Sequence, residues 1–228
     1  MLTLYLQAPF ATFRHFTAGS FRPTAGFLTP SAAYGLLLNV AGIEMRIDEG
    51  REMTVVRQGL PAVRLALGAL SMPIQHFVYQ QLHNYPVGKD AGKNYAAGAR
   101  GNKYNISPVR RAFLSGIRAY VCMDGNPELE KQVLEGVAGR GARGYGLPFL
   151  GDNSFLIDRL EAVERREPAY WFERIEGGDG EGIRPGTSRL TVTIDRANMA
   201  GTRSFLYAPT EHKTVDIPER AWTEVAYS

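Results

Sequence analysis

Residues 126–160, "NPELEKQVLEGVAGRGARGYGLPFLGDNSFLIDRL", predict a helix, a glycine-rich loop and a strand, in that order. Asn126 is a good helix N-cap, and Pro127 suits the first helical position. Apolar residues then recur at helical spacing, which predicts a helix over 127–138. After the loop, apolar and polar residues alternate, which predicts a strand near 154–158.

The loop itself contains the pattern G-x-G-x-x-G at Gly139, Gly141 and Gly144. A dinucleotide site needs this pattern between a strand and the helix that follows it, whereas here a helix precedes the loop. We therefore exclude a dinucleotide site. Glycine lets a backbone approach a ligand closely, and Arg140 and Arg143 add positive charge. A phosphate-binding loop and an ordinary connection both remain open.

The chain on either side of this stretch completes an alternating pattern of strands and helices. A helix over 31–42 can be capped by Thr29, with Pro30 just inside it. Strands are predicted over 2–8, 52–58, 63–70, 74–82 and 117–123. With an insert set aside, the skeleton approximates βαββαβ, an α+β fold of the ferredoxin-like or RNA-recognition type over residues 1–158. Residues 159–228 are rich in short strands and predict a second, smaller β subdomain.

The length of 228 residues, with 44% apolar residues, suffices for one large domain or two small ones. The longest apolar stretches are too short to span a bilayer, and the N-terminus lacks the features of a signal peptide. Cys122 is the only cysteine and lies in an apolar run, which excludes a disulfide within the chain and favours a buried thiol. We expect a cytoplasmic protein with no membrane contact.

The net charge of +3 is unevenly distributed along the chain. Residues 1–43 contain no acid, and residues 53–123 contain nine basic residues but only one acid, Asp90. Such asymmetry is typical of a protein that binds a polyanion, although a solvated basic face without a partner is the alternative.

The insert, about residues 83–109, is rich in Gly, Ala, Lys and Asn and has too little apolar surface to bury a core. Strands flank it, and tyrosines lie among its cations, which predicts a projecting hairpin. Aromatic rings that stack on bases and cations that hold phosphates are what single-stranded nucleic acid requires.

Four stretches together resemble one family. They are "LQAPFATFRHFTAGSFRPTAGFLTPSAAYGLLLNVAGI" from residue 6, "HNYPVG…GNKYNISPVRRAFLSG" over 83–116, "GLPFLGDNSFLIDRL" from residue 146 and "LTVTIDRANMAGTRSFLYAP" from residue 190. The combination is similar to the Cas-five proteins, which are RNA-binding RAMP subunits of CRISPR Cascade complexes, and most similar to their DevS (Cmx-five) branch.

This resemblance implies a ferredoxin-like RAMP domain with a projecting thumb, here about 83–109, and a small C-terminal sheet. It implies a non-catalytic subunit of a type I Cascade that grips the 5′ handle of the guide RNA (crRNA) and caps the backbone filament. The implied partners are the guide RNA, the Cas-seven backbone subunits, the large Cascade subunit and target DNA near its PAM-proximal end. The glycine-rich loop over 139–146 would lie against RNA phosphates, and no cofactor is implied.

The candidate RNA contacts follow from the charge, the aromatic residues and this resemblance together. Arg14 would hold a phosphate beside a phenylalanine that stacks on a base or seals the core, and the start of the first helix offers free N–H groups. Arg110 and Arg111 are adjacent on a strand and face opposite ways, so one should meet RNA and the other an acid or a protein neighbour. The full set is Phe13, Arg14, His15, Arg22, Ser31, Tyr34, Lys89, Lys93, Lys103, Tyr104, Arg110, Arg111, Arg140, Gly141, Arg143 and Gly144.

Two alternatives belong to other classes. One branch of the family cleaves precursor RNA without metal, and His76, His83 and Lys89 could meet near the base of the thumb for such chemistry. The chain has no adjacent Lys-His pair at the corresponding thumb position, which disfavours this metal-independent endoribonuclease. The other alternative is a ferredoxin-like enzyme or regulator whose basic face is incidental. Four scattered histidines and one cysteine show no metal-ligand spacing, so no metal is expected.

Overall fold

The structure is a computed structural model that describes residues 1–14, 20–50, 54–83, 106–142, 144, 146–176 and 183–227, the side chains of 82, 83, 106 and 107 excepted. Its elements are β1 (Leu2–Ala11), β2 (Phe21–Arg22), α1 (Pro30–Val40), β3 (Arg46–Ile47), β4 (Val55–Val56), β5 (Val63–Ser71), β6 (Ile74–His83), β7 (Ile106–Asp124), α3 (Pro127–Val137), β8 (Arg159–Ala162), β9 (Tyr170–Arg174), β10 (Ser188–Thr193), β11 (Arg203–Pro209) and β12 (Thr223–Val225). Two short 3₁₀ turns, Met199–Gly201 and Glu219–Ala221, precede β11 and β12.

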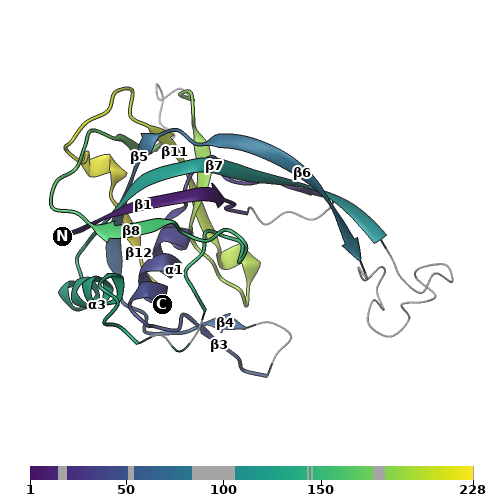
Figure 1. Ribbon diagram of the computed structural model, residues 1–228, viewed down its shortest axis with the longest axis horizontal. Coiled ribbons are helices and arrows are strands. Elements are labelled where there is room, and N and C mark those ends of the chain that lie inside the picture. The colour runs from purple at the N-terminus through teal and green to yellow at the C-terminus, as the bar shows by residue number, and fades with distance from the viewer. Residues whose placement is uncertain are drawn as a thin grey trace.

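One large sheet organises the chain, with the strand order β10-β11-β9-β5-β7-β1-β8. The four strands β5, β7, β1 and β8 pair antiparallel throughout. The C-terminal strands continue the same sheet, because β9 pairs with both β5 and β11 and β12 pairs with β5. Figure 1 shows α1 lying against this sheet, with α3 beside it. Within the described parts of the chain, no helix is both long and apolar enough to cross a bilayer.

The helices α1 and α3 begin where their capping residues predict. The Thr29 side chain accepts a hydrogen bond from the Ala32 N–H at 3.2 Å, and the Asn126 side chain accepts one from the Leu129 N–H at 3.0 Å. Each cap satisfies a backbone donor that the first helical turn leaves unpaired. The helices end at Val40 and Val137, slightly before the predicted ends.

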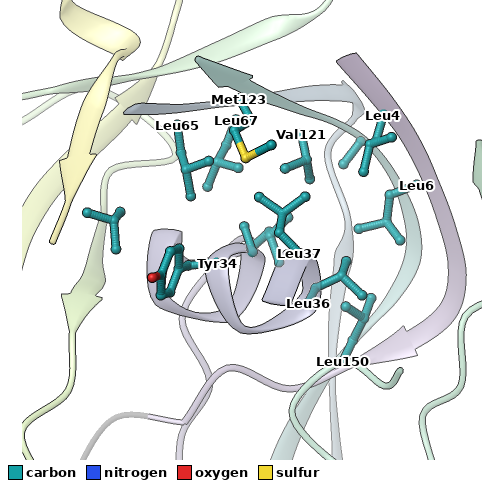
Figure 2. Close-up of a cluster of buried hydrophobic side chains, with 14 of the residues drawn as sticks. Leu4, Leu6, Tyr34, Leu36, Leu37, Leu65, Leu67, Val121, Met123 and Leu150 are labelled. Carbon is teal, nitrogen blue, oxygen red and sulfur yellow. The ribbon is translucent and has the colours of Figure 1, made fainter. Parts of the chain in front are cut away.

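The core lies between α1 and the sheet, as Figure 2 shows. Leu4 and Leu6 of β1 and Leu37 of α1 are fully buried there. Burial of each such leucine contributes roughly 1.5–3 kcal/mol relative to an exposed side chain. The alternation that predicted β1, β5 and the second half of β7 is therefore the pattern of a sheet with helices on one face.

One predicted strand is wrong in position, and another is shorter than predicted. The segment near 154–158 is not a strand: Leu156 forms only an isolated bridge with Phe149, and the strand that pairs with β1 is β8. The Asp152 side chain accepts a hydrogen bond from the Ser154 N–H at 2.9 Å, and this turn interrupts the extended chain. Of the segment predicted over 52–58, the structure describes residues 54–58, where β4 is the strand, and it pairs with β3 outside the main sheet.

A long hairpin extends from the sheet beyond the rest of the chain (Figure 1). Its arms are β6 and the first half of β7, paired from Ile74↔Ser115 to His83↔Ile106. At Gly116, where φ is +71°, β7 passes from this hairpin into the main sheet, and such a φ favours glycine. The expected strand over 117–123 is thus the second half of a 19-residue strand. Residues 84–105 of the insert lie outside the described residues.

Candidate nucleic-acid interface

The hairpin joins the main sheet at a cluster of arginines and aromatic rings. We call this region the hairpin root and define it by residues 21–22, 77–80 and 109–113. The short strand β2 pairs parallel with β7 there, aligning Phe21 with Arg110 and Arg22 with Arg111. Because side chains alternate along a strand, Arg110 and Arg111 project from opposite faces of the sheet.

On one face, Arg110 lies between two phenylalanine rings. Its Cζ atom is 4.1 Å from the ring centroid of Phe77 and 5.4 Å from that of Phe21. Tyr79 lies directly opposite Arg110 on β6 and is 74% exposed. None of the ion pairs among described residues includes Arg110, so its charge faces solvent beside exposed rings. This arrangement offers both a cation for phosphate and flat surfaces for bases.

On the opposite face, Arg111 forms an ion pair with Asp152. The same carboxylate oxygen of Asp152 accepts a hydrogen bond from Arg14 at 3.2 Å. Arg111 and Asp152 are largely buried, whereas 43% of the Arg14 side chain is exposed. Of the two adjacent arginines, Arg111 is therefore the one that meets an acid, and Arg110 is the one that faces outward.

The pKa values reflect this close packing of charges. Desolvation raises the pKa of Asp152, but the hydrogen bonds from Arg111 and Ser154 outweigh it and bring the value down to about 2. Burial lowers the pKa of the Arg14 guanidinium, and the nearby charges of Arg111 and Arg22 lower it further. Two arginines thus share one carboxylate, and a third, Arg22, is close enough to affect the charge of Arg14, which leaves a net positive charge at this site.

A hollow of about 260 Å³ opens beside this ion pair. Three aromatic rings that contact one another line it: the centroid of Phe10 is 5.6 Å from that of Phe113 and 5.9 Å from that of Phe155. Val78 and Gln80 of β6 complete the apolar and polar lining, together with Arg111 and Asp152.

Three of the predicted contacts lie in the interior instead. Phe13 is 4% exposed and belongs to the core. Tyr34 has no exposed surface. Its hydroxyl donates to the Pro61 carbonyl oxygen at 2.8 Å, and its ring stacks on Tyr227. Ser31 is buried, with its hydroxyl 3.1 Å from that of Thr29. The expectation that Tyr34 and Ser31 contact RNA is corrected, because both side chains serve the packing and capping of α1.

The glycine-rich loop follows α3 and is exposed at Arg140, Gly141 and Gly144. A Cβ at Gly144 would meet nothing within 4 Å, whereas one at Gly141 would lie 3.1 Å from the Cα of Gly136. The positive φ in this loop, +73°, belongs to Gly139. With respect to the described residues, the loop thus has open space around Gly144, where a ligand could approach the backbone.

The remaining predicted contacts, His15, Lys89, Lys93, Lys103, Tyr104 and Arg143, lie outside the described residues. Of the three residues considered for RNA cleavage, His83 has an undescribed side chain and Lys89 is undescribed. The third, His76, is exposed on β6, with its Nε2 atom 2.8 Å from the Ser115 hydroxyl. Among the described residues, no three His, Cys, Asp or Glu side chains gather as a metal site would require.

The sequence analysis missed the aromatic residues of the hairpin root and of the adjoining hollow, and the carboxylate that binds two arginines. The missed residues are Phe10, Phe21, Phe77, Tyr79, Phe113, Phe155 and Asp152. Exposed rings in β6 carried a usable signal, because Phe77 and Tyr79 alternate with polar residues in a strand that leads into a basic insert. The basic residues of 53–123 do not all gather at one site, because Arg64 forms an ion pair with Glu219 rather than lying in the hairpin root.

Comparisons with solved structures identify the class of fold. The structure described as "CRISPR RNA-guided surveillance complex" aligns with a TM-score of 0.58 at 14% identity, covering 93% of this chain and 90% of the other. The structure described as "Crystal structure of Cas protein" aligns with a TM-score of 0.50 at 16% identity, covering 96% and 97%. The chain therefore has the fold of a CRISPR-associated protein.

The family model for CRISPR-associated protein (Cas_Cas5) matches residues 1–226. The chain belongs to this family, which confirms the resemblance to the Cas-five proteins. A comparison with curated proteins finds no match.

Proposed function

We propose that this protein is a non-catalytic, guide-RNA-binding subunit of a type I CRISPR Cascade complex. It grips the 5′ handle of the guide RNA and caps the filament of Cas-seven backbone subunits, so that the complex can target DNA. Family membership and the likeness to a CRISPR RNA-guided surveillance complex support this role.

The strand order supports the finer assignment of the fold. Taken in chain order, β1, β5, β7 and β8 are the four strands of a βαββαβ unit, with α1 after the first and α3 after the third. They lie in the sheet in the order second, third, first, fourth. This order is the one expected of a ferredoxin-like domain of the RAMP type, with the β6–β7 hairpin as the base of its thumb.

The single observation that carries the proposal is Arg110 between the exposed rings of Phe21 and Phe77. Exposed phenylalanine and tyrosine rings that flank a cation cost solvation free energy in isolation, so a partner that covers them is favoured. Single-stranded RNA has flat bases for the rings and phosphates for the guanidinium, and each stacked base contributes roughly 1–3 kcal/mol.

Other parts of the proposal extend from this surface. The glycine-rich loop would carry a phosphate near Gly144, and the thumb would contact the adjoining backbone subunit. The large subunit and the PAM-proximal end of target DNA would lie beyond the handle, and the complex would act in the cytoplasm.

An endoribonuclease that processes the precursor RNA is the second candidate. One observation favours it: exposed His76 stacks on Phe113 at 5.3 Å between centroids, beside the Arg111 ion pair. An imidazole next to cations that could hold a scissile phosphate is a feasible general acid or base.

One experiment tests binding and cleavage together. The purified protein is incubated with its own repeat RNA, with and without EDTA, and analysed on native and denaturing gels. We expect a shifted RNA that stays intact in both conditions. Specific cleavage in EDTA that His76→Ala abolishes would favour the nuclease instead.

Variants test the surface that carries the proposal. Arg110→Ala and Phe77→Ala should each weaken handle binding about tenfold or more. The matched control is Arg189→Ala, an exposed arginine on β10 at the far end of the strand order from the hairpin. Equal binding by all three variants and the wild type would overturn the proposed surface.

A further inference from the structure

The hollow beside the Arg111–Asp152 ion pair has the features of a site for one flat aromatic group. Phe10, Phe113 and Phe155 come from β1, β7 and the turn after residue 152, and their rings lie within 6.1 Å of one another by centroids. The volume, about 260 Å³, falls just below the roughly 300–1,000 Å³ of pockets that bury drug-sized ligands. A single heterocycle is the size of ligand that this hollow fits.

The polar groups at the edge of the hollow can recognise such a heterocycle through hydrogen bonds. Asp152 has about four lone-pair sites, of which Arg14, Arg111 and the Ser154 N–H use three. The Ser154 side chain also stabilises this carboxylate, and a donor group on the ligand would replace it at the remaining site. The remaining site can only accept a hydrogen bond, because the low pKa keeps this carboxylate ionised at neutral pH. The Nε atom of Arg111 is buried without a hydrogen-bond partner among the described residues, an arrangement that native interiors seldom leave uncompensated.

The charge around the hollow favours a ligand that carries a phosphate. Arg14 and Arg22 influence one another electrostatically, and Arg14 is substantially exposed at the rim. Arg14 and Arg111 against the one carboxylate of Asp152, with Arg22 nearby, leave positive charge beside an aromatic lining. An apolar side chain of a partner protein would fill the hollow but would leave this charge unused, whereas a nucleotide uses both.

We propose that this hollow binds one nucleobase that the RNA turns out of its stack, while Arg14 and Arg22 hold the adjoining phosphate. The base stacks on the ring of Phe113 or Phe155, and Asp152 accepts a hydrogen bond from its exocyclic amino group. The site therefore favours adenine, cytosine or guanine over uracil, because the one N–H on the pairing edge of uracil lies between two carbonyl oxygens that the carboxylate repels. This inference rests on the proposed RNA-binding function and adds a base-selective subsite on the face of the sheet opposite Arg110.

The test is an abasic scan of the handle RNA taken from the protein's own repeat. Each position in turn is synthesised without its base, and binding is measured by fluorescence anisotropy with the wild type and with Phe113→Leu/Phe155→Leu. Leucine keeps the apolar volume and removes the flat ring. We expect one position whose base contributes about tenfold or more to wild-type affinity and less than about twofold to the variant's. Uracil at that position should weaken wild-type binding to a similar extent.

A second measurement needs only the wild-type protein, so it stands if the variant fails to fold. 2-Aminopurine, a base with an exocyclic amino group, replaces the base at the same position, and its fluorescence should rise when it leaves the RNA stack on binding. Normal binding with no position coupled to the two rings, a preference for uracil, or an unchanged 2-aminopurine signal would overturn the subsite and leave the proposed function intact. Failure of the wild type to bind the handle at all would overturn both.

Discussion

Replacing Asp152 by asparagine should destabilise the protein at neutral pH and leave it nearly unaffected in acid. The Asp152 carboxylate binds Arg14 and Arg111, accepts the Ser154 N–H at 2.9 Å, and is only 13% exposed. Its pKa is about 2, against an ordinary value of 3.8. This difference corresponds to about 2.5 kcal/mol of stability at neutral pH.

The sign of the pH dependence follows from the direction of this shift. Because the folded pKa lies below the ordinary value, the contribution is fully present above about pH 4 and is lost as the pH falls toward 2. For a chain of this length, about 2.5 kcal/mol lowers Tm by roughly 5–10 °C. Thermal unfolding followed by circular dichroism from pH 2 to 7 should therefore give two curves of Tm that differ near pH 7, approach one another below about pH 4 and nearly converge at pH 2.

The matched control is Glu161→Gln, which removes an acid from an ion pair with Arg159 whose two side chains are about half exposed. An exposed pair contributes about 1 kcal/mol or less, so this variant should change Tm little at any pH. A Tm difference for Asp152→Asn that stays constant from pH 7 to 2, or that is absent at pH 7, would refute the claim that the ionised carboxylate holds the two arginines in place.

Three further predictions concern the glycines of α3 and of the loop that follows it, the salt dependence and the thumb. Gly136→Ala should lower the free energy of unfolding in urea by about 1–3 kcal/mol, because the new Cβ would lie 1.9 Å from the Val40 carbonyl oxygen. Gly144→Val should instead leave Tm unchanged and weaken handle binding about tenfold, and the reverse pattern would make Gly144 structural. The logarithm of the handle binding constant should fall with the logarithm of salt concentration with a slope between about −3 and −4, for four to six phosphates held, and a slope near zero would contradict phosphate contacts. Replacing residues 86–103 with a short Gly-Ser turn should shift Tm by only a few degrees yet prevent co-purification with Cas-seven subunits and guide RNA, and normal co-assembly would show that this segment is dispensable.

The helices and strands that the sequence predicts correctly are those whose capping residues and apolar pattern agree with the residues that the fold buries. Thr29 and Asn126 cap their helices because each side chain accepts an N–H of the first turn. The leucines of β1 alternate because one face of the strand contacts α1 and the core. Both signals lie within a few residues of the element that they define.

The errors arise where the same pattern serves another purpose. Alternation around Phe155 suggested a strand, but Asp152 turns the chain there and places the ring beside Phe10 and Phe113. The site was partly hidden for a similar reason. Arg14 and Asp152 are 138 residues apart in the sequence, so only the pairing of strands in the folded sheet reveals that they share a hydrogen bond.

If the hairpin root holds the guide RNA, ultraviolet irradiation of the assembled complex should crosslink the RNA to this surface. The complex is purified with its guide RNA, irradiated and digested, and RNA-linked peptides of this subunit are identified by mass spectrometry. We predict crosslinks in the peptides that contain Phe21, Phe77 or Tyr79, and their loss in a complex that carries Arg110→Ala. Crosslinks confined to β10 and β11, with none at the hairpin root, would contradict the account.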